Sequence, residues 1–171
     1  EESHAELQDQ IEIEMDAFKP ESIYERLNTA EKVLSAWPVE TTWQGDRAFY
    51  QTREDRITMP AKKLFQTTEG MYSTWAHEQV HSTGHESRLN RDMGPETLVY
   101  AREELVAELG AFLICNKLQI CSDELNHAAY LKHWIEVLQQ RPDALRLALS
   151  DASKAAGLIC KDLDQQVEVN M

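Results

Sequence analysis

One short run, His77-Glu78-Gln79-Val80-His81, limits the fold of this chain more than any other part of its sequence. It matches the pattern H-E-x-x-H, in which the two histidines are four residues apart. On a helix, residues at this spacing lie on the same face, so both imidazoles can converge on one point. Glu78 projects about 100° further around the helix axis. The motif therefore predicts a helix that presents two histidines on one face and a carboxylate beside them.

Two imidazole nitrogens and an adjacent carboxylate are the parts that a zinc hydrolase needs. We predict His77 and His81 as metal ligands, Zn²⁺ as the cofactor, and Glu78 as the general base. Zinc lowers the pKa of its water to about 7, so a neighbouring carboxylate can complete the deprotonation at neutral pH. The opposing interpretation is a solvated helix face with two histidines, because a pattern with three fixed positions also occurs by chance.

A third ligand must come from elsewhere, and the sequence offers three candidates. His85 follows His81 by four residues, but Gly84 is expected to end the helix before it. Glu104 and Glu108 share one face of a later predicted helix, so one can bind the metal while the other orients an imidazole. We favour Glu104, with Glu108 and His85 as alternatives.

Four further residues are not expected to take part in the site. Glu103 is expected to point away from the metal and into solvent. Ser87 stands where the longer metzincin pattern, H-E-x-x-H-x-x-G-x-x-H, requires a third histidine, so that class of peptidase is excluded. Tyr100 and Tyr130 are expected to lie at the edge of the core rather than to stabilise an oxyanion.

The hydrophobic patterns predict an α+β fold. Apolar residues at helical spacing after Pro20 predict a helix that stops before Pro38. The runs ETTW, AFYQ and RITM predict a small antiparallel meander within residues 39–60, followed by a short helix at AKKLF. Four further helices are predicted at residues 67–84, 95–118, 123–140 and 143–166. Residues 1–19 are expected to form a flexible or partner-dependent arm, and residues 20–171 a single domain.

Charge and composition exclude several classes of function. The formal net charge of −13 argues against direct nucleic-acid binding, which requires clustered Lys and Arg. The sequence contains no apolar run of the roughly 20 residues that span a bilayer, and its acidic start is unlike a signal peptide. Three cysteines without a C-x-x-C pair favour a reducing, cytoplasmic location. The oligomeric state is left open.

Three longer segments carry a resemblance to a known family. AFYQTREDRITMP, YSTWAHEQVHSTGHESRLNRD and YAREELVAELGAFLIC resemble the zincin-like metallopeptidase domain of ArdC-type antirestriction proteins, plasmid primases and polyvalent proteins. The resemblance covers roughly residues 40–160. The chain is similar, more distantly, to ImmA/IrrE-type peptidases, in which a glutamate placed like Glu104 is a metal ligand.

The resemblance implies a zincin fold with an active-site helix among four to five helices, and a zinc peptidase active in defence or counter-defence. Its substrate would be a protein or peptide, paired along the DRITMP strand as the edge of the sheet. Arg88, Asn90, Arg91 and Asp92 match the RLNRD segment of the family and are expected to brace the metal helix. The alternative is a non-catalytic metal-containing module that docks on a defence, repressor or DNA-transfer protein.

Overall fold

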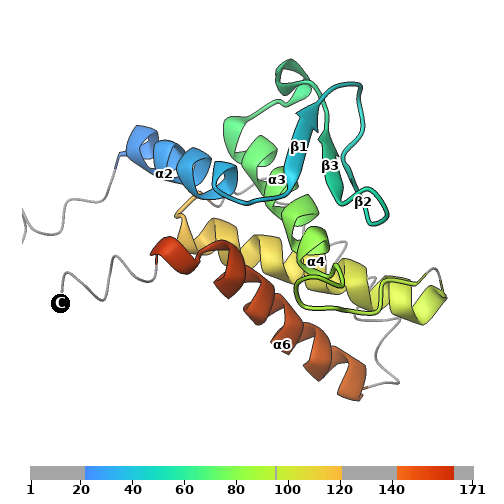
Figure 1. Cartoon of the computed structure of the whole chain (residues 1–171). Coiled ribbons are helices and arrows are strands. Elements are labelled where there is room, and N and C mark those ends of the chain that lie inside the picture. Colours follow the sequence, from blue (N-terminus) through green and yellow to red (C-terminus); the bar gives the residue numbers. More distant parts are fainter. Residues whose placement is uncertain (1–21, 95, 121–141, 164–171) are drawn as a thin grey trace, which may run out of the picture.

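The computed structural model describes residues 22–94, 96–120 and 142–163 (Figure 1). The expected arm at residues 1–19 and the helix predicted at residues 123–140 lie outside this part of the chain. The helices and strands are α2 (Ile23–Ser35), β1 (Glu40–Trp43), β2 (Phe49–Gln51), β3 (Arg56–Met59), the 3₁₀ helix η1 (Lys62–Leu64), α3 (Thr68–Thr83), α4 (Thr97–Lys117) and α6 (Pro142–Ile159). The α+β fold class is confirmed.

Helix α2 begins with a capping box at Ser22. The Ser22 hydroxyl accepts a hydrogen bond from the Glu25 backbone N–H at 3.2 Å, and the Glu25 carboxylate accepts one from the Ser22 N–H at 2.7 Å. Together these bonds satisfy two amide groups that the first turn of a helix leaves unpaired. The helix ends at Ser35, ahead of Pro38 as predicted.

The three strands occur where they were predicted, to within one residue, but the antiparallel meander is wrong. The strand order is β1-β3-β2, with β1 parallel and β2 antiparallel to β3. Ile57, Thr58 and Met59 of β3 are all buried, whereas β2 is half-buried to exposed. A strand buried on both faces belongs in the middle of a sheet, and this requirement decides the order.

The predicted role of DRITMP as the edge strand is therefore also wrong. Its residues form β3, which has a neighbour on each side. The edge strand beside the site is β2: Phe49 and Tyr50 line the same cavity as Glu78, and the Tyr50 backbone N–H donates to the Glu78 carboxylate on α3.

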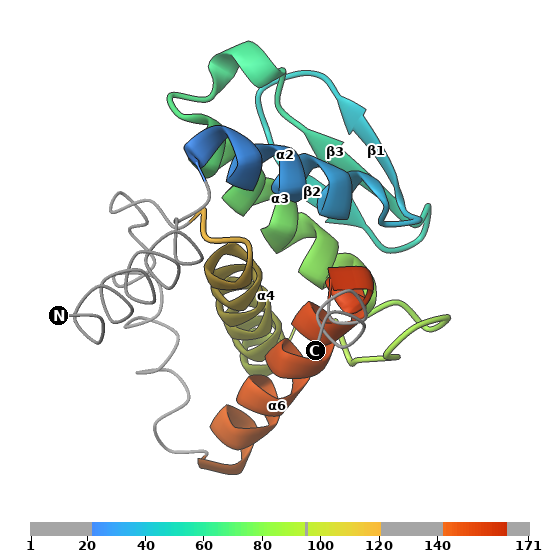
Figure 2. The same ribbon diagram turned by 90° about the vertical axis from the view of Figure 1, so that its left-hand side faces the viewer.

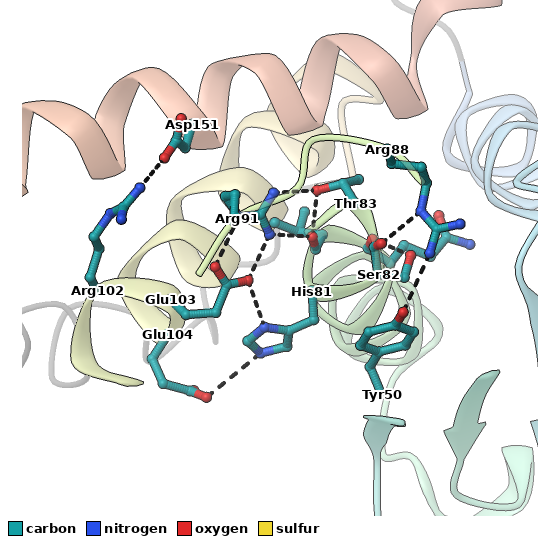
Figure 3. Close-up of polar contacts among 12 residues, drawn as sticks. Tyr50, His81, Ser82, Thr83, Arg88, Arg91, Arg102, Glu103, Glu104 and Asp151 are labelled. Atoms are coloured by element: carbon teal, nitrogen blue, oxygen red, sulfur yellow. Dashed lines mark hydrogen bonds and ion pairs between the residues drawn. The ribbon is translucent and has the colours of Figure 1, made fainter. Parts of the chain in front are cut away.

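Helix α3 occupies the centre of the molecule. It lies between the sheet with α2 on one side and the α4–α6 pair on the other (Figures 1 and 2). Its buried residues belong to the same hydrophobic core as those of the sheet and the other helices. Trp75, for example, packs edge-on against Trp43, with the two ring centroids 5.2 Å apart. An ion pair between Arg102 and Asp151 links α4 to α6 (Figure 3). This arrangement encloses the H-E-x-x-H helix on several sides.

Two further observations concern cysteine and membrane segments. Cys115 and Cys160 are buried in the core, as expected of small apolar residues. No helix in the described ranges combines the length and the apolar character that crossing a bilayer requires.

Candidate metal centre

The start and the end of α3 are fixed by local contacts. The Thr67 hydroxyl caps its first turn by accepting the Gly70 N–H at 3.0 Å. Gly84 ends the helix, as predicted, but its φ of −74° is not left-handed. A Cβ at this position would lie 2.6 Å from Met93 Sδ and 3.0 Å from Arg91 Nη2. A side chain at this position would press on Met93 and Arg91, because the following loop folds back against the helix end.

His77 and His81 face one another on α3, as the i, i+4 spacing predicts. Their Nε2 atoms are 3.1 Å apart, and their side chains are 18% and 12% exposed. Burial alone would lower the pKa of His81, but the hydrogen bond to Glu103 and other nearby carboxylates outweigh this and raise it. The pair directs two nitrogen donors at one point.

Glu104 joins this pair from α4. Its carboxylate oxygens lie 3.6 Å from His81 Nε2 and 3.9 Å from His77 Nε2. In the part of the chain that the structure describes, His77, His81 and Glu104 form the group of donors suited to a metal ion. Ligands bound at 2.0–2.1 Å to one tetrahedral ion lie roughly 3.3 Å apart, so these separations fit a divalent cation.

The two alternative third ligands are placed elsewhere. Glu108 approaches the other nitrogen of His77, with Oε1 3.6 Å from Nδ1. This position suits a group that orients the imidazole, as anticipated for one member of the glutamate pair. His85 lies beyond the end of α3, where its Nδ1 is 2.8 Å from the Ser87 hydroxyl.

Glu78 is a buried carboxylate beside the metal donors. Only 7% of the residue is exposed, and burial raises the pKa of Glu78 to about 7. The charges of Glu104 and Glu108 act in the same direction. His81 and the backbone N–H of Tyr50, which donates to the Glu78 carboxylate, act against it. A carboxyl group with this pKa can exchange a proton near neutral pH, which is the property of a general base.

The expectation that Glu103 is solvated is wrong. Glu103 is 6% exposed, and its Oε1 lies 3.2 Å from His81 Nδ1 (Figure 3). Arg91 donates to both carboxylate oxygens, at 2.9 and 2.6 Å. Burial would raise the pKa of Glu103, but the hydrogen bonds from Arg91 and His81 outweigh it and lower the pKa. An ionised Glu103 accepts the Nδ1 proton of His81 and leaves the Nε2 lone pair free for a metal.

The loop after α3 braces the metal helix, as its sequence predicted. Arg91 also donates to the Val80 carbonyl and the Thr83 hydroxyl, at 2.8 and 2.7 Å. Arg88 donates to the Ser82 carbonyl at 2.7 Å. Both arginines therefore bind the last turn of α3 and hold the helix end against the loop.

A cavity of about 380 Å³ opens over these groups. Tyr100 borders it: half of this tyrosine is exposed, its hydroxyl is hydrogen-bonded to Glu104, and it lies outside the hydrophobic core cluster, so the expected core-edge position is wrong. Tyr130 lies outside the described residues. The lining residues are Arg47, Ala48, Phe49, Tyr50, His77, Glu78, His81, Met93, Tyr100, Glu103 and Glu104. The cavity thus extends from the metal donors to the exposed edge of β2.

Residues 28–151 match the family described as zincin-like metallopeptidase. The chain belongs to this family. The zincin-like domain is also similar to solved structures of the antirestriction protein ArdC from plasmid R388. The Mn(II)-bound structure superimposes with a TM-score of 0.69 at 33% identity, covering 78% of this chain and 51% of ArdC. The metal-free structure gives a TM-score of 0.65 at 31% identity, covering 85% of this chain and 52% of ArdC.

Two curated relatives extend the comparison. The chain is 37% identical over 155 residues to a DNA primase TraC of Escherichia coli, covering 88% of this chain and 11% of the primase. It is 30% identical over 135 residues to the uncharacterized protein y4eC of Sinorhizobium fredii, covering 77% of this chain and 44% of that protein. The zincin-like domain therefore spans less than half the length of these relatives.

Proposed function

We propose that this zincin-like domain is a zinc-dependent peptidase of the gluzincin type. The observation that carries the proposal is a buried carboxylate, Glu78, beside three converging metal donors and a cavity open to solvent. His77, His81 and Glu104 would hold the ion. Two nitrogens and one carboxylate oxygen suit zinc, and they also suit the Mn(II) present in an ArdC structure.

The chemistry divides between the ion and the side chains. When bound, Zn²⁺ supplies a positive charge that acidifies water and polarises a peptide carbonyl. Glu78 accepts a proton from the attacking water and returns it to the leaving amine. Glu103 and Glu108 keep the two imidazoles oriented through their Nδ1 atoms. Glu78 thus carries the proton transfers that peptide-bond hydrolysis requires, while Glu103 and Glu108 hold the imidazoles in place.

The substrate we propose is an extended segment of a protein, lying beside β2 over the cavity. The similarity to ArdC and TraC supports a role in mobile-element transfer, defence or counter-defence. We propose no direct nucleic-acid contact for this domain, because acidic residues outnumber basic ones by 30 to 17. The location proposed for this activity is the cytoplasm.

Replacing Glu78 by Gln tests the catalytic role. The amide cannot take a proton from water, so we expect hydrolysis to fall by at least about 100-fold while the affinity for Zn²⁺ is retained. Substrates are first identified by comparing peptide termini in cells that express the parent or the variant. Purified substrate is then cleaved in vitro, and bound metal is identified by elemental analysis.

Glu86→Gln is the matched control, because Glu86 is an exposed glutamate in the loop that follows α3. It should cleave at the parental rate. Equal cleavage by parent and Glu78→Gln would contradict the base assignment.

The alternative is a non-catalytic module that keeps its metal for structure and docks on a partner protein. The net charge of −13 favours this reading, since it suits a basic partner surface. Metal binding without any cleavage difference between the parent and Glu78→Gln, combined with metal-dependent capture of a protein, would favour the module over the enzyme.

A further inference from the structure

Tyr50 of β2 makes two kinds of contact at once. Its backbone N–H donates to the Glu78 carboxylate. Its hydroxyl, at the other end of the residue, donates to Asp55 Oδ1 at 2.7 Å and accepts a hydrogen bond from Arg88 at 3.3 Å (Figure 3). One residue thus connects the general base to a polar cluster formed by Asp55 and Arg88.

The polar cluster spans two parts of the chain. Asp55 lies in the turn between β2 and β3, and its φ of 48° is left-handed. Arg88 follows α3 and donates to both Asp55 oxygens, at 3.0 Å to Oδ2 and through a shorter contact to Oδ1. The same guanidinium donates through Nε to the Ser82 carbonyl in the last turn of α3. Arg88 therefore ties the β2–β3 turn directly to the metal helix.

The planar guanidinium suits this task. It offers donors in a fixed fork, so its two contacts with Asp55 and one with Ser82 set an orientation as well as a distance. The side chains of Arg88 and Asp55 are 14% and 33% exposed, so the pair is partly shielded from water. The Arg88 contact holds the pKa of the Asp55 carboxyl below its ordinary value, and the pair stays ionised at neutral pH.

We infer that Asp55 and Arg88 are positioning residues for the general base: they hold β2 against α3 so that the Tyr50 N–H meets the Glu78 carboxylate. The inference rests on the proposed function for its catalytic consequence. Neither side chain lines the cavity over the metal donors, so both act through Tyr50. We call the ion pair of Asp55 and Arg88 the clamp. Loosening the clamp should displace the edge of β2 and free Glu78 to rotate, while the metal ligands keep their positions.

Asp55→Asn is the direct test. Asparagine tolerates a left-handed φ and can still accept from the Tyr50 hydroxyl, but it loses the charge that pairs with Arg88. We expect exchange of the Tyr50 amide hydrogen, followed by NMR, to accelerate about tenfold or more. We expect kcat to fall roughly tenfold with KM little changed, and affinity for Zn²⁺ to stay within about threefold of the parent.

Two further variants keep the test decisive. Asp143→Asn makes the same chemical change in an exposed ion pair with Arg146 on α6, and it should alter none of these quantities. Tyr50→Phe removes only the hydroxyl, so it replaces Asp55→Asn if that variant does not fold, and the same faster exchange is expected.

The outcomes separate the two proposals. Unchanged exchange of the Tyr50 amide in both variants would overturn the clamp, and so would faster exchange with a parental kcat. An inactive parent with faster exchange in Asp55→Asn would retain the clamp and reject the peptidase proposal.

Discussion

At the scale of single residues, three glutamates within six positions of α4 do different things because each points in its own direction. Glu104 faces Nε2 of His77 and His81, Glu108 approaches Nδ1 of His77, and Glu103 contacts Nδ1 of His81. The helical rotation of about 100° per residue separates the directions of Glu103 and Glu104. One turn of helix therefore supplies both a ligand and the group that orients another ligand.

Glu103→Gln tests the orienting role through stability in metal-free protein. Removing the charge leaves the buried Arg91 uncompensated, which costs roughly 3 kcal/mol at neutral pH. The folded protein holds the pKa of Glu103 below its ordinary value of 4.5, so its contribution is present above that value. It is lost as pH falls through the lower folded pKa. Thermal unfolding of parent and variant between pH 7 and pH 3 should show a stability gap that closes below about pH 4.5.

Glu96→Gln, an exposed glutamate just before α4, should show no gap at any pH. A gap for Glu103→Gln that widens on acidification would contradict the ionised state of Glu103.

Single-residue prediction from sequence succeeded where helix geometry alone decides. The separation of His77 and His81 places both on one face, but it does not select a third ligand: Glu104 was favoured over Glu108 and His85, and in the structure its carboxylate lies near both histidines. The role of Glu103 was missed because its partner, Arg91, arrives from a loop that no periodicity describes. A signal was present: Glu103 heads a stripe of small and apolar residues at 107, 110, 111 and 114 that marks the buried face of α4.

At the scale of elements, a close contact between α3 and α4 constrains how the two helices that carry the metal donors pack together. A Cβ added at Gly110 would lie 2.8 and 2.9 Å from the two methyl carbons of Val80. The helices can approach this closely only because Gly110 lacks a side chain. Val80 precedes His81 and Gly110 lies six residues after Glu104, so this crossing fixes how the two ligand-bearing helices face each other.

Gly110→Ala should move α4 away from α3. Overpacking costs about 1–3 kcal/mol, and the better helix propensity of alanine recovers at most about 1 kcal/mol. We expect a net loss of about 1 kcal/mol in unfolding free energy and a weaker affinity for Zn²⁺, measured by denaturant unfolding and calorimetry. Combining it with Val80→Ala should restore much of both.

Gly157→Ala provides the matched control, because nothing lies within 4 Å of a Cβ at this position on α6. Here alanine should stabilise the protein by roughly 0.5–1 kcal/mol. If both glycine variants gain stability, the tight crossing does not constrain the fold.

The positions of helices and strands were predicted well, because a local residue pattern determines them. The order of the strands was predicted wrongly, because it depends on which strands pair with one another. The three runs of β-prone residues became strands, but their order depended on which run was buried on both faces. Alternation identifies a strand without identifying its neighbours. Gly84 is the helix end as predicted, but with a right-handed φ of −74° rather than the left-handed value that glycine favours at such ends.

At the scale of the whole molecule, the metal donors come from two helices that are separate in sequence. His77 and His81 belong to α3, whereas Glu104 belongs to α4. A bound ion would join these helices and reduce the mutual repulsion of the carboxylates around it. The stability of the domain should therefore depend on the concentration of free metal.

Chelation measures that dependence. At a free Zn²⁺ concentration of 100 times Kd, binding stabilises the folded state by about 2.7 kcal/mol. For a chain of this size, each 1 kcal/mol corresponds to roughly 2–4 °C, so a chelator should lower Tm by about 5–10 °C. Glu104→Gln should show a smaller shift. An identical Tm with and without chelator would argue against a metal site that bridges α3 and α4.

The shortness of β2 has a consequence for how the protein behaves at high concentration. An exposed strand edge is a template on which other chains can add strands, and long, flat edges promote aggregation. β2 is three residues long, and the outward N–H of Tyr50 already has an acceptor in Glu78. Few backbone groups remain for a second copy to pair with. The cavity is therefore bordered by a strand edge that is too short to serve as a template for the growth of fibrils.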